Sequence, residues 1–529
     1  MASPTKVLFL EMDAGDCELI RRWAADGTMP AFGKLLEHGL SGPTMSLKDF
    51  FVGGTWPSFY TGVTPDHHGI HSLVQLRNGT YDFYRCDINA EIKRRPFWET
   101  LSNVGRRVAI LDIPLSGISE QINGIQSVEW GSHDAIYGFC AQPPDFEEDL
   151  KSRFGLHPLE RICNYHGGAA EDFIELRDKL VAGVHNKCEL TKHYLRQGGW
   201  DFFAQVFTES HCVGHQCWHL HDDSYPGYNS QLVAAIGNPI CEVYQAIDTS
   251  IAEILDLVDD TTTVIVLVGH RMAHKIGAQF LLPDVLAALG VAVFKTLKDK
   301  TTVARIDDIL TWGWQHVPQR LRTPLQGIHQ SLIDRRDQLP RLPPSVGRLK
   351  AASSHCFTMD CGFPVSGIRL NLIGREPQGL IKPGAEADRF SDQLIDDLLE
   401  IVDLETGIKM VKEVRKSDDD YHGEYRDTLP DLLVAWNDEH RLGSASCGDS
   451  SGSYLRLYSD KMGLVEGINH YVRTGDHRPQ GMFVVMGPGI RKGQLNRTVS
   501  IMDFAPTFCE MLNAKLPDVD GVPIQELLE

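Results

Sequence analysis

Five residues that suit metal binding stand beside short apolar runs in the sequence. They are Asp13 after KVLFLEM, His211 and His215 in FTESHCVGHQCWHLHD, His270 in GHRMAH, and His477 in TGDHRPQG. Imidazole nitrogens and carboxylate oxygens are the ligands that zinc, iron and manganese accept in proteins. The sequence therefore predicts a site for a divalent transition metal. Zinc is the expected ion, and iron and manganese are the alternatives.

His211 and His215 are four residues apart in a segment that follows an apolar run. Residues at this spacing lie on one face of a helix, so both rings can share one ion. A solvated surface pair is the alternative interpretation, but the position at the end of a strand, beside Gly214, favours metal binding. His219 and His221 follow closely, and we expect them to be solvated or to support the ligands.

A second candidate segment reads GGTWPSFYTGVTPDHHGIHS and contains Thr55. Gly53 and Gly54 allow a close approach before Thr55, and Pro57 favours the first turn of a helix. A hydroxyl at that position faces the positive end of the helix, which suits a phosphate or an oxyanion. Taken alone, Thr55 is a helix cap. A threonine hydroxyl becomes a nucleophile only where a base or a metal activates it.

Strands and helices alternate along the chain and must position these residues. Short runs rich in β-branched residues predict strands, and 3.6-residue periodicity predicts helices. The predicted strands are Lys6–Met12, Arg107–Ile113, Asp201–Thr208, Thr263–Val268, Gly367–Leu372, Asp431–Trp436 and Gly481–Met486, and the predicted helices are Pro30–His38, Glu171–Gln197 and Ile240–Val258. This order predicts an α/β fold with a mostly parallel central sheet flanked by helices. Such sheets bind ligands at the carboxyl ends of their strands, where the candidate residues stand.

One segment interrupts this alternation. Leu297–Pro344 is rich in Lys, Arg, Asp and Gln, and we predict that it forms a helical insertion or cap. The predicted organisation is therefore a first part of the core over residues 1–296, the insertion over residues 297–344, and a second part of the core over residues 345–529.

Composition narrows the classes of partner. The 529 residues suffice for a large core, and 42% hydrophobic and 23% charged residues are typical of a globular protein. A net charge of −20 disfavours nucleic acid and anionic membranes, so we expect a small-molecule substrate. The sequence has no signal-peptide core, no apolar run of about 18 residues and only scattered cysteines, which predicts a cytoplasmic setting. The oligomeric state stays open, a homodimer included.

Several phrases of the sequence, in the same order, resemble one known family. They are the strand ending at Asp13, TWPSFYTGVTPDHHGI, SHCVGH, GHRM, GDHRPQG and DFAPTFCEMLNAKLPDVDGVPI. Together they resemble the type I phosphodiesterase/nucleotide pyrophosphatase branch of the alkaline phosphatase superfamily. The likeness runs from residue 6 to residue 526, with the insertion between its parts. It implies an alkaline phosphatase-like fold.

The resemblance also implies a metal-dependent hydrolase of phosphate esters. Members of the family hold two nearby ions, commonly zinc. A Thr or Ser on one ion attacks phosphorus, and the other ion activates the water that releases the covalent intermediate. Carried over to this sequence, Thr55 is the nucleophile. The first site is then His211, His215 and His477, and the second site is Asp13, Thr55 and His270.

Two positions depart from the family's pattern. His211 stands where the family has an aspartate, and Gly269 stands where it has the aspartate that precedes His270. The site thus loses two negative charges, and three neutral histidines on the first ion would leave it a stronger Lewis acid, as in three-histidine zinc sites. The second site is short of ligands, and His274, four residues after His270, is a candidate to complete it. One ion and two ions both stay open.

Three residues are candidates for contacting the substrate. His133 lies in EWGSHD, and Arg271 and Arg478 each stand beside a candidate ligand. A guanidinium group binds phosphate or carboxylate well, but a salt bridge within the protein fits these positions equally. Glu209 and Asp476 also neighbour ligands, and they are candidates to orient histidine rings.

Three functions fit these observations. The leading hypothesis is a hydrolase or phosphotransferase of a small organic phosphate ester, acting through Thr55 and metal-activated water. The first alternative keeps the fold and the metals but cleaves a carboxyl-type or carbamoyl-type bond, because the lost carboxylates change the charge that the site tolerates. The second alternative is a descendant that binds a ligand without catalysis. The retained Asp13, Thr55 and four histidines argue against this second alternative.

Overall fold

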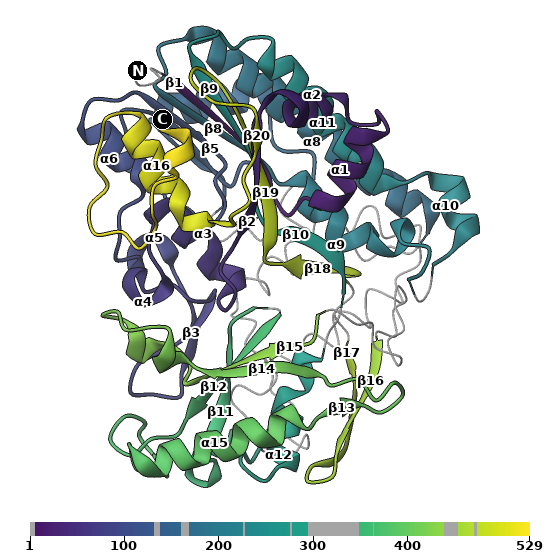
Figure 1. Ribbon diagram of the computed structural model, residues 1–529, viewed down its shortest axis with the longest axis vertical. Coiled ribbons are helices and arrows are strands. Elements are labelled where there is room, and N and C mark those ends of the chain that lie inside the picture. The colour runs from purple at the N-terminus through teal and green to yellow at the C-terminus, as the bar shows by residue number, and fades with distance from the viewer. Residues whose placement is uncertain are drawn as a thin grey trace.

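The computed structural model describes residues 6–131, 138–159, 169–225, 228–275, 278–294, 349–362, 364–438, 453–469 and 473–528. The predicted insertion over residues 297–344 and the candidate residue His133 lie outside these ranges. Figure 1 shows a larger part that carries both ends of the chain, and a smaller part beneath it.

A ten-stranded sheet runs through the larger part. Its five central strands are parallel, in the spatial order β9 (Thr262–Val268), β1 (Lys6–Met12), β8 (Phe202–Phe207), β5 (Val108–Leu111) and β6 (Gly124–Val128). The remaining strands are β19 (Gln480–Met486), β2 (Leu40–Met45), β20 (Gly493–Gln494) and β21 (Val499–Ser500) on the β9 side, and β7 (Cys140–Gln142) beside β6. β19 runs antiparallel to both β9 and β2. The predicted α/β fold with a mostly parallel central sheet is confirmed.

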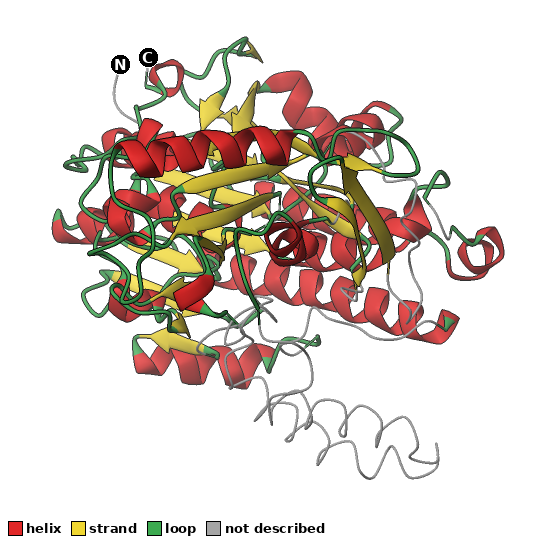
Figure 2. Ribbon diagram, turned by 90° about the horizontal axis from the view of Figure 1, so that it is seen from below, coloured by secondary structure: helices red, strands yellow, loops and turns green. Residues whose placement is uncertain are grey.

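Helices cover both faces of this sheet (Figure 2). Successive side chains of a strand point to opposite faces. Accordingly, Leu8 and Leu10 of β1 belong to one buried core, and Val7 and Phe9 belong to another. The first core is covered by α1 (Cys17–Ala25), α2 (Pro30–His38), α7 (Pro144–Phe154), α8 (Ala170–Gln197), α9 (Glu209–His221) and α11 (Pro239–Leu255), and the second by α3 (Phe51–Thr61), α6 (Phe97–Asn103) and α16 (Phe504–Met511).

Most predicted elements of the larger part occur where the sequence placed them. β1 and α2 have the predicted bounds, and α2 begins at Pro30 and ends before Gly39. The other predicted elements that lie in or against the central sheet differ from their predicted bounds by three residues or fewer, which is the usual uncertainty at element ends.

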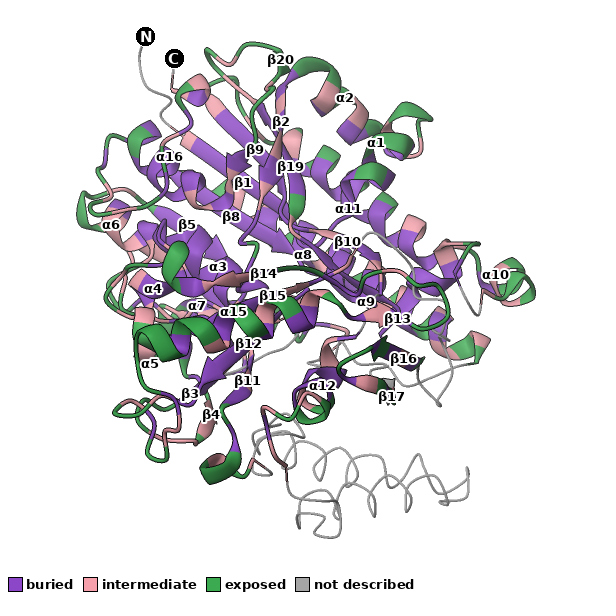
Figure 3. Ribbon diagram, turned by 60° about the horizontal axis from the view of Figure 1, so that its bottom comes forward, coloured by how far each residue is buried: buried purple, intermediate pink, exposed green. Residues whose placement is uncertain are grey.

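The smaller part has its own sheets and its own core. An antiparallel sheet follows the order β11 (Cys356–Asp360), β12 (Val365–Leu370), β15 (Leu432–Trp436), β14 (Val411–Lys416), and a second one follows β13 (Val402–Asp403), β16 (Ser453–Ser459), β17 (Gly463–Asn469). α12 (Leu282–Ala288) and α15 (Ala385–Leu399) pack on the same core, and α15 turns its outer face to solvent (Figure 3). Two of the predicted strands, now β12 and β15, therefore belong here. The predicted second part of the core enters the central sheet only from Gln480 onward.

A short two-stranded ladder extends from the paired strands β9 and β19, beyond the edge of the central sheet. β10 (Arg271–His274) follows β9, β18 (Gly475–Arg478) precedes β19, and the two pair antiparallel. The register sets Met272 opposite His477 and Arg271 opposite Arg478, so these two pairs point to opposite faces of the ladder. None of the described helices has the length and apolar character that crossing a bilayer requires.

Candidate metal centre

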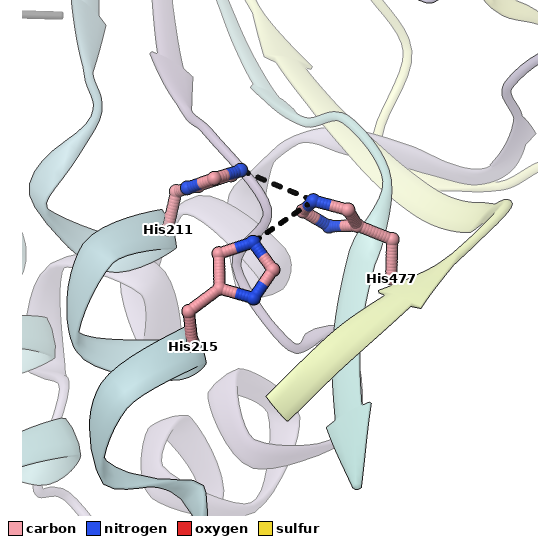
Figure 4. A group of neighbouring side chains, drawn as sticks. All are labelled: His211, His215 and His477. Carbon is pink, nitrogen blue, oxygen red and sulfur yellow. Dashed lines mark hydrogen bonds between the residues drawn. The ribbon is translucent and has the colours of Figure 1, made fainter. Parts of the chain in front are cut away.

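Three histidine side chains from two distant segments converge in the larger part (Figure 4). His211 and His215 project from one face of α9, and their ring centroids lie 4.4 Å apart. His477 comes from β18. Its Nε2 atom lies 3.1 Å from Nε2 of His211 and 3.1 Å from Nε2 of His215. All three side chains are buried. The predicted pair on one helix face is therefore present, and it meets the late histidine of the sequence.

Backbone contacts fix the orientation of this cluster. His215 Nδ1 lies 2.8 Å from the carbonyl oxygen of Gly475. A carbonyl oxygen only accepts hydrogen bonds, so Nδ1 carries the proton and Nε2 keeps the lone pair that a metal needs. The backbone N–H of Thr474 also donates to the carbonyl of His215 at 2.7 Å. A Cβ at Gly475 would lie 2.2 Å from the carbonyl oxygen of Gly214, so glycine lets β18 approach α9 this closely.

His270 and Asp13 form a second group next to the cluster. His270 Nε2 lies 3.7 Å from Asp13 Oδ1. The His270 ring lies 4.6 Å from the His477 ring and 6.3 Å from the His211 ring, measured between centroids. Asp13 sits just beyond β1, where its N–H donates to the carbonyl of Phe207 on β8. The strand ends thus bring together residues that are far apart in the sequence, as expected for the carboxyl edge of a parallel sheet.

Thr55 lies in the first turns of α3, a buried helix on the face of the sheet opposite to α9. α3 contains a kink at Val52 and Gly53, and Gly53 has φ +104°. A Cβ at Gly53 would also lie 2.8 Å from the Cα of Ser72, so the kink requires glycine. The regular helix begins after this kink. Thr55 Oγ1 is buried and has no hydrogen-bond partner among the described residues. The expected helix-cap hydrogen bond is therefore not made.

Phe51 links the segment of Thr55 to the histidines. Its ring centroid lies 5.0 Å from that of His270 and 5.5 Å from that of His477. α3 therefore packs directly on both histidine groups, and its aromatic ring forms one wall of the site. A buried apolar wall of this kind strengthens electrostatic interactions inside the site, because it excludes water.

The donor set fits a transition metal. Within the described part of the chain, the ligand atoms of His211, His215 and His477 lie close enough together to hold one ion. Three imidazole nitrogens are a known ligand set for catalytic zinc. Beside them, Asp13 and His270 offer a carboxylate oxygen and a nitrogen 3.7 Å apart, and both donors suit a second ion.

A second cluster of potential ligands, Cys188, Glu189 and Glu253, has a simpler explanation. Lys192 Nζ contacts both carboxylates at 2.6 Å. Burial raises the pKa of Cys188 to about 11, so this thiol stays protonated near neutral pH. The cluster is therefore a surface ion-pair network rather than a metal site.

Glu209 is bound elsewhere and does not orient the histidines. Its Oε1 lies 2.8 Å from His157 Nε2 and 3.4 Å from Lys187 Nζ, and all three side chains are buried. Burial alone would raise the pKa of Glu209, but Lys187 and His157 hold it below its ordinary value. Asp476 accepts a hydrogen bond from the backbone N–H of His477 at 3.1 Å. It therefore supports the backbone of a candidate ligand rather than the ring.

The comparisons with known proteins agree with this geometry. The family model for type I phosphodiesterase / nucleotide pyrophosphatase matches residues 7–280, just over half of the chain. The chain belongs to this family. The matched range contains Thr55 and every candidate ligand except His477. No curated protein sequence matches the chain.

Two solved structures resemble this phosphodiesterase-family chain along nearly its full length. Phosphonoacetate hydrolase from Sinorhizobium meliloti 1021, in complex with phosphonoacetate, is 13% identical, covers 97% of this chain and 96% of its own, and gives a TM-score of 0.52. Wild-type alkaline phosphatase PafA is 14% identical, covers 100% of both chains and gives a TM-score of 0.51. At such identities the likeness shows the fold, which is alkaline phosphatase-like.

In this phosphodiesterase-family member the two candidate arginines lie away from the histidine cluster. Both point to the face of the β10–β18 ladder opposite His477, where they line a cleft of about 700 Å³. Arg478 is buried and donates to the backbone carbonyls of His477 at 2.8 Å and His274 at 2.9 Å. Arg271 forms ion pairs with Glu18 and, at 3.6 Å, with Asp16. These contacts favour the alternative that the arginines stabilise the protein.

His274, the residue predicted to complete the second site, ends β10 and forms no compact group of ligand atoms with Asp13 and His270 among the described residues. A different residue approaches the position where the family's aspartate is missing. Glu11 is buried on β1, and its Oε1 atom would lie 2.5 Å from a Cβ at Gly269. Burial, and then the Asp13 carboxylate, raise the pKa of Glu11 well above its ordinary value.

The sequence reasoning did not single out Glu11. The available signal was an acidic residue inside the apolar run KVLFLEM, two positions before Asp13.

Proposed function

We propose that this protein hydrolyses a small organic phosphate ester with Thr55 as nucleophile and a histidine-rich site for one or two divalent metal ions. The observation that carries the proposal is that Nε2 of His211 and Nε2 of His215 each lie 3.1 Å from Nε2 of His477, next to the group of His270 and Asp13. Membership of a phosphodiesterase family supports the reaction class.

His211, His215 and His477 would hold the first ion, and Asp13, Thr55 and His270 would contribute to a second. When bound, such ions supply Lewis-acid stabilisation of phosphoryl oxygens and lower the pKa of water and hydroxyl groups. Zinc suits the donor set best, with iron and manganese as alternatives. The side chains of the protein supply the nucleophile and bind the phosphate.

The chain positions a nucleophile and a binding surface for phosphate. Thr55 Oγ1 forms a bond to phosphorus while the bond from phosphorus to the leaving oxygen breaks, and water then cleaves the phosphothreonine. Thr55 lies near the start of the regular part of α3, and the free N–H groups at this positive helix end would stabilise the transferred phosphoryl group. Phe51 excludes water from one side of the site, where its ring packs on His270 and His477.

One observation favours a second candidate function. An all-histidine first site lacks the carboxylate that lowers an ion's charge, and three-histidine zinc sites also serve reactions at carbon. A metallohydrolase of a carboxyl-type or carbamoyl-type bond is therefore the second candidate. It shares the metals with the main proposal but not the bond that is cleaved.

Substrate profiling after metal loading tests the proposal. The full chain is stripped with a chelator, reloaded with Zn²⁺, Mn²⁺ or Fe²⁺, and assayed with p-nitrophenyl phosphate, bis(p-nitrophenyl) phosphate and p-nitrophenyl acetate. The proposal predicts metal-dependent turnover of at least one phosphate ester, at a rate well above that of the acetate. Turnover of the acetate alone would support the second candidate. A chain that binds none of these metals would overturn both.

A further inference from the structure

Glu11 is an unusual residue for a central strand. β1 is paired on both sides, and the neighbours of Glu11 are Leu267 on β9 and Val206 on β8. Its side chain is 1% exposed. Among the described residues, Glu11 Oε2 has no hydrogen-bond partner and the carboxyl group forms no ion pair. A buried carboxylate without a counter-charge is unfavourable, so the structure needs a reason to keep this residue.

The position of the side chain supplies that reason. Glu11 shares a face of β1 with Val7 and Phe9, the face covered by α3, and Asp13 follows two residues later, just beyond the end of the strand. Asp13 is the residue that lies 3.7 Å from His270. The carboxyl group of Glu11 reaches the neighbouring strand end and lies against Gly269, the residue before His270.

Glu11 and Gly269 fit each other sterically. A Cβ at position 269 would lie 2.5 Å from Glu11 Oε1, which is closer than real Cβ contacts allow. A longer acidic side chain at position 11 and a residue without a side chain at position 269 therefore share one space. An aspartate at position 269, as in the family's pattern, would place its own carboxylate into that same space.

We propose that Glu11 is a ligand of the second metal ion and replaces the carboxylate that is missing at position 269. This inference rests on the proposed function, because it requires the metal centre. It gives the second site two carboxylates, from Glu11 and Asp13, together with His270 and Thr55. Relative to the family's pattern, only the first site then loses a carboxylate, at position 211. The second site keeps the negative charge that a divalent ion requires.

Metal binding to the full chain tests this inference without any assay of activity. Wild type, Glu11→Gln and the double variant Glu11→Gly/Gly269→Asp are stripped with a chelator and titrated with Zn²⁺. The readouts are stoichiometry by elemental analysis and affinity by competition with a chromophoric chelator. Asp248→Asn is the matched control, since Asp248 is a buried carboxylate whose oxygens accept from the N–H groups of Ala31 and Phe32. Circular dichroism establishes that each variant is folded.

We expect two ions in the wild type and in Asp248→Asn. In Glu11→Gln we expect the first ion to be retained and the second to bind at least tenfold more weakly, on the order of what changes around a metal ligand produce. The double variant should bind the second ion again, and it keeps the test decisive if the single variant folds poorly.

Two outcomes would overturn the inference while leaving the proposed function standing. One is two ions of unchanged affinity in Glu11→Gln. The other is a single ion in wild type that Glu11→Gln binds equally well. A wild-type chain that binds no ion would instead overturn the proposed function itself, and the inference with it.

Discussion

Nε2 of His211 and Nε2 of His477 lie 3.1 Å apart although 266 positions separate the two residues in the sequence. The first residue belongs to α9 and the second to β18, and His215 lies 3.1 Å from His477 in the same way. Two imidazole nitrogens at this distance share either a proton or a metal ion. Since His215 Nδ1 donates to the carbonyl of Gly475, its Nε2 faces the cluster as an acceptor.

Loss of His215 should remove the first ion. We expect His215→Ala to bind Zn²⁺ more weakly by over about 100-fold, the upper end of what is seen for residues that only support a ligand. His219→Ala is the control, because His219 lies on the same helix, bonds to Thr474 Oγ1 at 3.1 Å and stands outside the cluster. Competition with a chromophoric chelator measures both affinities. Equal affinities in the two variants would contradict the assignment.

Gly475 should be essential for assembly of the cluster. A Cβ at this position would meet the carbonyl oxygen of Gly214 at 2.2 Å, so Gly475→Ala must push β18 away from α9. We expect a loss of roughly 1–3 kcal/mol in the free energy of unfolding, as for other overpacked sites, together with weaker Zn²⁺ binding. Gly493→Ala is the matched control, since its nearest neighbour would be Leu40 Cδ1 at 3.8 Å. Urea unfolding of the metal-free proteins separates the two effects.

The buried group of Lys187, Glu209 and His157 should stabilise the fold near the site. Lys187 is fully buried and donates to Thr208 Oγ1 at 2.9 Å and to the carbonyl of Val206 at 3.0 Å. Lys187→Met would leave Glu209 without its main counter-charge, so we expect a loss of about 3–5 kcal/mol in the free energy of unfolding. Lys192 pairs with the partly exposed Glu189 and Glu253, so Lys192→Met should lose about 1 kcal/mol or less in the free energy of unfolding. A similar loss in both variants, measured by urea unfolding, would contradict this account.

His68 should make stability depend on pH. Burial lowers the pKa of His68 to about 3, from 6.5 for a free histidine. Its Nδ1 accepts the N–H of Ile70 at 3.1 Å, so protonation of the folded protein would break that bond. Between these two pKa values the unfolded chain binds more protons than the folded one. The contribution of His68 to the free energy of unfolding is therefore complete above pH 6.5 and is lost as the pH falls from 6.5 towards 3.

The variant that tests this is His68→Asn, which cannot titrate. Between pH 7 and pH 5, the wild type should lose about 2 kcal/mol more of its free energy of unfolding than the variant does. Urea unfolding at the two pH values measures this difference. The same loss in both proteins would show that His68 is not the group responsible.

Much of the candidate site could be predicted from the sequence because it depends on strand ends. The apolar runs ending before Asp13 and His270 are the neighbouring parallel strands β1 and β9, so these two residues meet at the carboxyl edge of the sheet. The spacing of His211 and His215 likewise determines that they share a helix face. Strand ends and helix spacing can be recognised locally, and the carboxyl-edge rule then brings residues at different strand ends to one region of the sheet.

Features that depend on pairing between distant segments could not be predicted. Arg271 and Arg478 stand beside candidate ligands in the sequence, but the register of β10 with β18 turns both to the opposite face of the ladder. The strands β12 and β15 were predicted at the right positions, yet nothing local distinguishes a strand of the central sheet from one in the smaller part. Glu11 could not be recognised as a site residue because its contact with Gly269 joins β1 to the end of β9, which are far apart in the sequence.

The most direct test of the central claim compares Thr55→Ala with Thr55→Ser in the Zn²⁺-loaded protein. Serine keeps a hydroxyl in the same place and alanine does not. With whichever phosphate ester the wild type turns over, we predict that Thr55→Ser retains activity within about tenfold and that Thr55→Ala loses about 10³-fold or more in kcat, while His211, His215 and His477 keep the first ion bound. Equal kcat values for Thr55→Ala and the wild type would contradict the account.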